Sequence, residues 1–171
     1  GVFYGRNKVY KNLGFDTFTS LEYMANTTMT PKNWCKDKVL TGEIEAALDS
    51  TDTPDLVYTV SVQGHGKYPT SPELEDPDIT VESIPNEDQH YSMEYYANQI
   101  YEMDAFIGKL VEMLENRDEK TILVMYGDHL PALQMDEDTL LTHDLYKTEY
   151  LIWNNFGLEK EDEGLKAYQL T

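Results

Sequence analysis

The chain has 171 residues and a formal net charge of −19, with 40% hydrophobic and 12% aromatic residues. This length and composition suffice for one domain with a buried core. The acidic charge argues against nucleic acid as a partner and against adsorption on an anionic membrane, because both require lysine and arginine. The single cysteine, Cys35, excludes an intrachain disulfide, and its place beside Trp34 indicates packing rather than nucleophilic chemistry.

The first part of the chain predicts two short helices. Residues 7–13 are compatible with a helix, and Gly14 follows them where a left-handed cap would end it. Residues 15–18 have the pattern of a short strand. A second helix is expected over residues 41–47, with Thr41 as its N-cap and acidic residues in its first turn.

Two strands and a long helix dominate the rest of the chain. Residues 56–62 and 121–126 are short apolar runs rich in β-branched side chains, typical of strands buried in a parallel sheet. Between them, residues 92–116 carry apolar side chains at helical spacing, with Ser92 as the expected N-cap. This order predicts a right-handed βαβ unit with parallel strands. Residues 150–153 predict a peripheral strand.

The remaining segments predict a long surface loop over residues 70–90 and an acidic helix over residues 158–170. No internal repeat or domain boundary is visible. The sequence therefore predicts an α/β fold in which helices flank a mostly parallel central sheet, as a single domain over residues 1–171.

Both predicted strands end in a loop that contains glycine and histidine. Gly127, Asp128 and His129 follow the later strand, and His65 lies between two glycines after the earlier one. Parallel strands end at one sheet edge, where open α/β sheets bind ligands, so His65 and His129 are expected to share a cleft. Carboxylate and imidazole are good ligands for a divalent metal. Gly127 is expected to permit a backbone turn whose conformation other residue types rarely adopt.

Each of these residues also has a purely structural interpretation. Asp128 and His129 also fit a polar surface turn, and alone they supply half of a closed site of about four ligands. The position of His65 is compatible with three roles: a third metal ligand, a group that binds a substrate oxygen, or a capped loop histidine. Lys67 is compatible with neutralising an anion or with a solvated position that has no role. Asp104 is expected at the solvated edge of the long helix.

Several common catalytic motifs are absent from the sequence. It contains no Gly-x-Ser-x-Gly, P-loop or dinucleotide fingerprint. The loop hydroxyls of Thr27, Thr28 and Thr30 have no obvious activating neighbour. A covalent mechanism would therefore take its nucleophile from elsewhere.

Four segments, in order, resemble one enzyme family. Residues 126–129, Tyr-Gly-Asp-His after an apolar strand, resemble the metal-binding signature of the sulfatase and alkaline phosphatase superfamily. Residues 3–6 and 9–16 resemble the Phe-Trp-Asn-Arg and Tyr-Lys-x-Leu-Gly-Tyr-Asp stretches of lipoteichoic acid synthases and related phosphoglycerol transferases. Residues 61–69 resemble the loop that carries their substrate-binding histidine. The resemblance extends over roughly residues 1–155.

The resemblance implies an alkaline-phosphatase-like fold, one divalent metal, usually manganese, and a threonine nucleophile that forms a covalent glycerophosphate intermediate. Asp128 and His129 would be metal ligands. His65 and Arg6 would bind the phosphate or glycerol group, and Tyr4 stands where the family often has tryptophan. The substrate would be a lipid or polymer that bears glycerophosphate.

In this family the acidic ligand and the nucleophilic threonine precede the Phe-Trp-Asn-Arg stretch. The chain is therefore expected to be a C-terminal fragment, incomplete at its N-terminus and inactive alone. The full-length protein is expected to be tethered to the membrane at its extracellular face. Sulfatase-like hydrolysis of a phosphodiester or sulfate ester fits the same motifs. The alternative from another class is a non-catalytic α/β domain that binds a cell-wall polymer or a protein.

Overall fold

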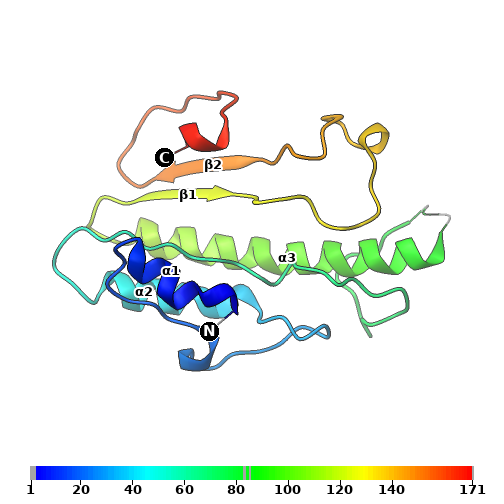
Figure 1. Cartoon of the computed structure of the whole chain (residues 1–171), viewed down its shortest axis with the longest axis horizontal. Coiled ribbons are helices and arrows are strands. Elements are labelled where there is room, and N and C mark those ends of the chain that lie inside the picture. Colours follow the sequence, from blue (N-terminus) through cyan, green and yellow to red (C-terminus); the bar gives the residue numbers. More distant parts are fainter. Residues whose placement is uncertain (1–2, 83, 85, 171) are drawn as a thin grey trace.

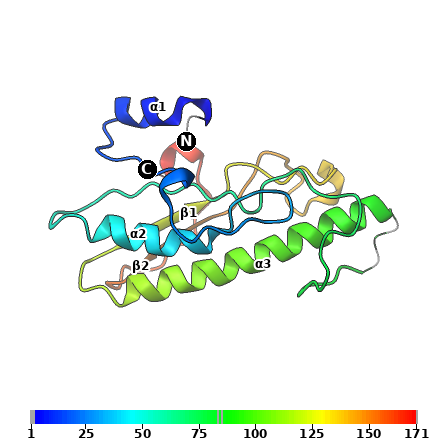
Figure 2. The same ribbon diagram turned by 90° about the horizontal axis from the view of Figure 1, so that it is seen from below.

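The structure is a computed structural model that describes residues 3–82, 84 and 86–170. The described residues form helices α1 (Arg6–Asn12), α2 (Leu40–Leu48) and α3 (Glu87–Glu115), and strands β1 (Ile122–Tyr126) and β2 (Tyr150–Asn154). Figures 1 and 2 show α3 running along most of the molecule, with α2 beside its C-terminal half. In Figure 1 the sheet lies on one side of α3, and α1 and α2 lie on the other.

The long helix predicted before β1 is confirmed, but it begins earlier than expected. Asn86 is its N-cap, and the Asn86 side chain accepts a hydrogen bond from the Gln89 backbone N–H at 3.1 Å. Glu87 and Asp88 occupy the first turn, where carboxylates are favoured by the helix dipole. The predicted cap, Ser92, lies inside the helix and donates instead to the Pro69 carbonyl at 2.8 Å.

The hydrophobic core lies between α2 and the C-terminal half of α3. Phe106, Leu110 and Leu114 are buried on one face of α3 and pack with Leu40 of α2. Trp153 of β2 packs against the same cluster from the sheet. Because Phe106, Leu110 and Leu114 recur four residues apart, one stripe of the helix contacts both α2 and the sheet.

The two shorter helices are also confirmed, with one correction at a cap. Gly14 follows α1 with a φ of +95°, the left-handed conformation expected of it. Thr41, however, is inside α2 and does not cap it. The N-cap residue is Val39, which makes no side-chain cap bond, and the Thr41 hydroxyl is buried without a hydrogen-bond partner in the described structure.

The predicted parallel βαβ unit is wrong for the described residues. β1 pairs with β2 in an antiparallel ladder, in which Ile122 lies opposite Asn154 and Tyr126 opposite Tyr150. Residues 56–62 run as an extended segment along the sheet in Figure 1, but they are not assigned to a strand. An apolar β-branched run favours extended backbone, yet it becomes a strand only where a neighbouring strand accepts its hydrogen bonds.

Two other predicted elements are absent from the described structure. Residues 15–18 form no strand, and residues 158–170 contain only the short 3-10 helix Ala167–Gln169. The C-terminal segment is strongly acidic and its side chains are mostly exposed, so tertiary packing does little to support a longer helix there.

Many apolar side chains of the extended segment and the sheet are exposed. Leu56 is 80% exposed and Ile122 is 54% exposed, although both were expected in a buried sheet. These exposed side chains, here called the open apolar face, are Leu56, Val57, Tyr58 and Val60 of the extended segment, and Ile122, Val124, Tyr126 and Ile152 on the sheet face away from Trp153. A surface of this composition is typical of a sheet that lacks a covering element.

A buried carboxylate holds the end of the extended segment. The Asp37 carboxylate accepts hydrogen bonds from the Ser61 hydroxyl at 2.6 Å and from the Val62 backbone N–H at 3.2 Å. The Asp37 backbone N–H donates to the side-chain oxygen of Gln63 at 2.8 Å. Burial raises the pKa of the Asp37 carboxyl above its usual range, while the bonds from Ser61 and Val62 act in the opposite direction.

Gln63 continues this network to α3. Its amide nitrogen donates to Gln99 at 3.1 Å and to the carboxylate of Glu102 at 2.6 Å, and Lys36 pairs with the other Glu102 oxygen at 2.6 Å. Gln63 is 1% exposed, so each of these bonds replaces water that the side chain has lost. The network therefore fixes the backbone that leads into His65.

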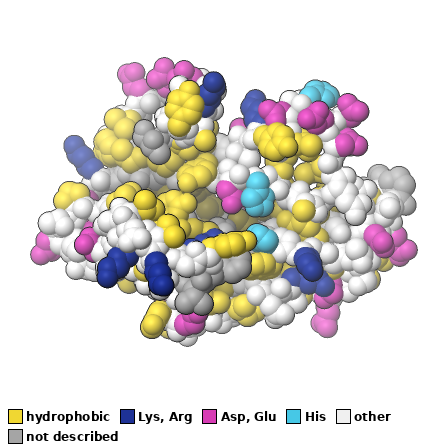
Figure 3. Space-filling model, in the orientation of Figure 1, with side chains coloured by type: hydrophobic (Ala, Val, Ile, Leu, Met, Phe, Trp, Pro, Cys, Tyr) yellow, Lys and Arg dark blue, Asp and Glu magenta, His cyan; other side chains and the backbone are white. Residues whose placement is uncertain are grey.

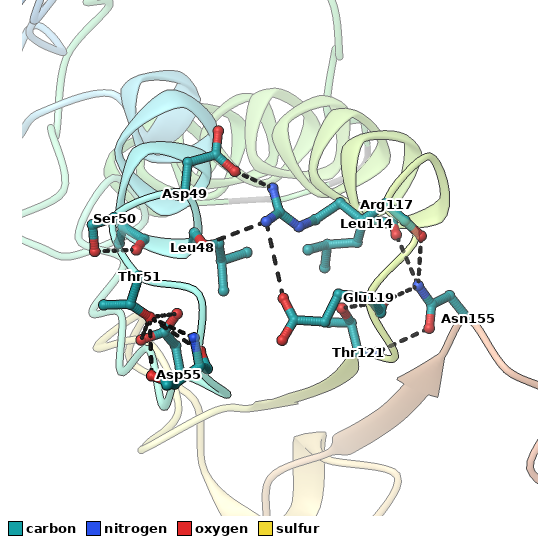
Figure 4. Close-up of polar contacts among 12 residues, drawn as sticks. Leu48, Asp49, Ser50, Thr51, Asp55, Leu114, Arg117, Glu119, Thr121 and Asn155 are labelled. Atoms are coloured by element: carbon teal, nitrogen blue, oxygen red, sulfur yellow. Dashed lines mark hydrogen bonds and ion pairs between the residues drawn. The ribbon is translucent and has the colours of Figure 1, made fainter.

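Asn155 joins the sheet to the end of α3 (Figure 4). Its side-chain oxygen accepts from the Thr121 backbone N–H at 2.8 Å, and its amide nitrogen donates to the carbonyls of Leu114 at 3.1 Å and Glu119 at 2.9 Å. Arg117 lies beside it and pairs with Asp49 at 2.7 Å, which ties α2 to the same corner.

We expect Asn155→Ala to lower the free energy of unfolding by about 2 kcal/mol, because it removes three hydrogen bonds to the backbone and leaves the partly buried Thr121 N–H without its partner. Chemical denaturation of both proteins measures this. Asn7→Ala, a matched change at an exposed position of α1, should shift the midpoint little. Equal stability of Asn155→Ala and the unchanged chain would contradict the anchoring role.

We expect Asp37→Asn to change how stability depends on pH. A carboxyl whose pKa is raised by folding contributes stability while protonated, and that contribution is lost as pH rises through its folded pKa. The neutral asparagine has no such loss. Unfolding free energies measured from pH 3 to pH 7 should therefore shift progressively in favour of Asp37→Asn. A pH-independent difference between the two proteins would contradict this.

Candidate functional site

The loops that follow residues 56–62 and β1 bring two histidines together. The ring centroids of His65 and His129 are 6.2 Å apart, and the rings are nearly perpendicular, at 83°. Their proximity, predicted from a parallel sheet, is confirmed although the parallel ladder is not. What positions His65 is the polar network around Gln63 and Asp37, which fixes the preceding backbone.

Both histidines have a defined tautomer in their neutral form. Nδ1 of His129 lies 2.8 Å from the Leu130 carbonyl oxygen, and Nδ1 of His65 lies 2.6 Å from the Gly66 carbonyl oxygen. A carbonyl oxygen can only accept, so Nδ1 carries the proton in each ring. Each Nε2 therefore presents a lone pair, which is the form that binds a metal or accepts a proton.

Asp128 faces this lone pair on His129. The Asp128 carboxylate oxygen lies 3.7 Å from Nε2 of His129, and the side chains are 83% and 64% exposed, respectively. Both groups can donate an electron pair to one divalent cation held between them. The pair thus has the donor chemistry of a divalent metal site.

The number of donors in the described structure is too small for a complete metal site. Residues 3–82, 84 and 86–170 contain no group of three or more histidine, cysteine, aspartate or glutamate side chains that could hold an ion. Asp128 and His129 fit part of a ligand set, and a closed site needs about four ligands. The described residues alone therefore do not complete the predicted centre.

Gly127 has a different role from the one predicted. Its φ is not in the left-handed region, so residues other than glycine can also adopt the backbone conformation found there. Instead, a Cβ at Gly127 would lie 3.3 Å from the Cβ of Thr148, whose hydroxyl donates to the Gly127 carbonyl at 2.7 Å. The glycine permits this close approach of the neighbouring segment, which supports the turn into Asp128.

Trp34 is part of the site, although no chemical role was predicted for it from the sequence. Its ring centroid lies 4.5 Å from that of His65, and its indole N–H donates to the Gly66 carbonyl at 2.9 Å. His65 thus contacts an aromatic ring as well as His129. The only sequence signal was an aromatic residue within an otherwise polar, irregular segment.

The segment that contains Tyr4 and Arg6 is linked electrostatically to the end of β1. The pKa of Tyr58 is raised to about 12, chiefly by its hydrogen bond with Tyr126 and by burial, and the charge of Arg6 acts in the opposite direction. Arg6 therefore lies near Tyr58. Tyr4 is 83% exposed just before α1. Roles for Tyr4 and Arg6 in ligand binding stay predictions.

The other candidates from the sequence make local contacts. Thr30 is buried and its hydroxyl accepts from the Trp34 backbone N–H at 3.1 Å, which is a structural role. Cys35 is buried as expected, and burial raises the pKa of its thiol. Asp104 is exposed on α3, also as expected. His143 is exposed, with Nδ1 3.1 Å from the Glu137 carbonyl.

The surface around the histidine pair combines polar and apolar regions. Figure 3 shows hydrophobic side chains around a hollow near the middle of one face, with histidine side chains beside it. Among the described residues, no helix is both long enough and apolar enough to cross a membrane.

Comparison with known proteins gives consistent matches. Residues 1–169 match the Sulfatase family. A Rhizobium meliloti (strain 1021) protein described as "Putative cyclic beta-1,2-glucan modification protein" is 35% identical over 134 residues, which are 78% of this chain and 20% of that protein. Lipoteichoic acid synthase 2 of Bacillus subtilis (strain 168) is 26% identical over 162 residues, which are 93% of this chain and 24% of that protein.

A solved structure shares the fold. The Streptococcus pyogenes phosphoglycerol transferase GacH in complex with sn-glycerol-1-phosphate superposes with a TM-score of 0.73 and 24% sequence identity, over 94% of this chain and 42% of that chain. The fold is therefore alkaline-phosphatase-like, although the described residues include only a two-stranded part of a sheet. The chain spans less than half of each of these proteins.

The family match extends over nearly the whole chain, and it agrees with the Gly-Asp-His loop and the adjacent histidine loop. The chain belongs to the sulfatase family, and it is similar in sequence to a lipoteichoic acid synthase.

Proposed function

We propose that this chain is part of a metal-dependent phosphoglycerol transferase. The observation that carries the proposal is the meeting of His65 with Asp128 and His129, at a ring separation of 6.2 Å between the histidines. In this arrangement Asp128 and His129 bind a divalent metal, for which manganese is our proposal, and His65 binds the phosphate of the substrate.

The proposed roles follow from the chemistry of the side chains. Nε2 of His65 has no hydrogen on it in the neutral ring, and protonation of that atom would let it donate to a phosphate oxygen. Arg6 would supply a permanent positive charge from the start of α1, and Tyr4 would flank the glycerol group. A bound divalent metal would polarise a phosphoryl oxygen and lower the pKa of an attacking hydroxyl.

The remaining parts of the site are proposed to come from residues outside this chain. The partial ligand set at Asp128 and His129 supports this, because the described residues supply no third ligand beside them. The open apolar face supports it too, because an added strand could pair with residues 56–62 and bury their side chains. An acidic ligand and a threonine nucleophile would then enter on that strand.

The substrate of the complete protein is proposed to be a lipid or polymer that carries glycerophosphate. The solved relative was determined with sn-glycerol-1-phosphate, which supports this class of ligand. The proposal places the complete protein at the extracellular face of the membrane, with a membrane tether outside this chain. Hydrolysis of a sulfate or phosphate ester is the second candidate, favoured by the Sulfatase family match. Comparing the turnover of glycerophosphate donors with the turnover of sulfate esters distinguishes the transferase from the hydrolase.

We expect His129→Ala in the complete polypeptide to lower kcat/KM for a glycerophosphate donor at least roughly a hundredfold, or about 2.7 kcal/mol of transition-state stabilisation. The reason is loss of a metal ligand. Turnover and bound manganese, measured together, check both parts. His143→Ala, at an exposed histidine with only a local bond, is the control and should leave both unchanged. Normal turnover by His129→Ala would reject the site.

We expect the 171-residue chain alone to show no turnover of glycerophosphate donors, because its described residues do not complete the metal site. Incubation with donor and manganese, followed by detection of released products, measures this. The complete polypeptide under the same conditions is the positive control. Clear turnover by the isolated chain would overturn the expectation, and Thr27 and Thr28 would then be tested as nucleophiles by alanine substitution.

A further inference from the structure

We propose that Trp34 is a positioning residue, which holds the imidazole of His65 in the orientation needed to bind the substrate. This rests on the proposed function, in which His65 binds the phosphate, and it adds the residue that orients that histidine. His65 is exposed. An exposed side chain samples several rotamers, and fixing one of them during binding costs conformational free energy. A contact that fixes the ring before the substrate arrives removes that cost from the binding step.

Trp34 acts on the His65 ring through a shared hydrogen-bond acceptor and through direct ring contact. The Gly66 carbonyl oxygen accepts from the Trp34 indole N–H at 2.9 Å, and it lies 2.6 Å from Nδ1 of His65. Both side chains thus donate to one oxygen, and the indole bond holds that oxygen in place. The ring centroids of Trp34 and His65 are 4.5 Å apart, and the ring planes are inclined at 51°.

Together these contacts define the direction of the second imidazole nitrogen, Nε2. The hydrogen bond at Nδ1 directs that nitrogen toward Gly66, but alone it leaves the imidazole free to turn about the bond. The indole of Trp34 lies in contact with the imidazole and restricts this rotation. Nε2, which the Gly66 bond leaves available, is then held in one direction. This is the atom proposed to meet the substrate phosphate.

Trp34 is itself held by bonds that do not involve His65. Its backbone N–H donates to the hydroxyl of buried Thr30 at 3.1 Å, and its carbonyl accepts from the Thr30 backbone N–H at 2.7 Å. Met29 and Cys35, on either side of this pair, form an isolated antiparallel bridge. The indole is therefore carried by a closed turn, and its position is fixed before any ligand binds.

The segment that carries Trp34 also holds the backbone before His65. Three positions after Trp34, the Asp37 carboxylate accepts hydrogen bonds from Ser61 and Val62. One short segment thus holds the loop before His65, through Asp37, and after it, through Trp34. Asp37 fixes the backbone, whereas Trp34 contacts the imidazole. A change at Trp34 should therefore act on ligand affinity through His65.

The test is a double-mutant cycle on the complete polypeptide with manganese, in which isothermal titration calorimetry measures the dissociation constant of sn-glycerol-1-phosphate. Trp34→Phe keeps an aromatic ring and removes the indole donor, and we expect it to weaken binding about threefold. Trp34→Leu removes the ring contact as well, and we expect it to weaken binding about tenfold. In a His65→Ala background, neither change should weaken binding further, because the ring that Trp34 orients is absent.

Trp153→Phe, at the other tryptophan of the chain, is the matched control. Trp153 packs against the hydrophobic core, so this change should lower the melting temperature and leave the dissociation constant unchanged. A loss of affinity that only follows reduced stability would appear in this variant too. Melting temperatures of all variants are measured alongside the titrations.

The outcomes separate the positioning role from the proposed function. Unchanged affinity in Trp34→Leu, with weaker binding by His65→Ala, would overturn the positioning role alone. Equal weakening by Trp34→Leu with and without His65 would also overturn it, because Trp34 would then act independently of the imidazole. Unchanged affinity in His65→Ala would overturn both the positioning role and the proposed role of His65. Normal turnover by His129→Ala, with coupled effects at Trp34 and His65, would reject the metal role and support the positioning role.

Discussion

Hydrogen bonds from buried side chains, rather than a β-ladder, hold the segment that carries His65. Asp37 binds Ser61 and Val62, and Gln63 reaches across to Gln99 and Glu102 on α3. An extended segment without a paired neighbour would otherwise be free to move, since no regular backbone bonds restrain it. The network is buried, so each lost bond would leave a polar group without water or a partner. The place of His65, and with it the whole candidate site, depends on this set of bonds.

The site joins parts of the chain that are far apart in sequence. Trp34 comes from an irregular segment, His65 from the loop after residues 56–62, and His129 from the loop after β1. The core between α2 and α3 and the Asn155 corner fix the sheet relative to the helix. The relative positions of the site residues therefore depend on the packing on both sides of α3. A ligand would meet a pre-arranged aromatic and imidazole surface, with the carboxylate of Asp128 exposed at its edge.

Local patterns predicted the helices well, because the apolar spacing and the capping residues that indicate a helix all lie within the helical segment itself. Gly14 ends α1 as expected, and the apolar spacing of α3 identifies a helix even though Asn86 caps it. The same method failed for residues 56–62, because strand pairing depends on a distant partner that no local pattern specifies. It found both histidine loops, since glycine beside histidine after an apolar run is a local signal. It missed Trp34, whose position next to His65 depends entirely on tertiary packing.

The open apolar face has a consequence for handling the isolated chain. Within it, residues 56–62 are not paired with a strand and can join the same residues of another copy, as exposed sheet edges do in aggregation. The net charge of −19 opposes such self-association through repulsion between copies. Salt screens this repulsion, because the Debye length falls to about 3 Å at 1 M ionic strength. Purification in dilute buffer therefore favours the monomer, and a high-salt step favours precipitation.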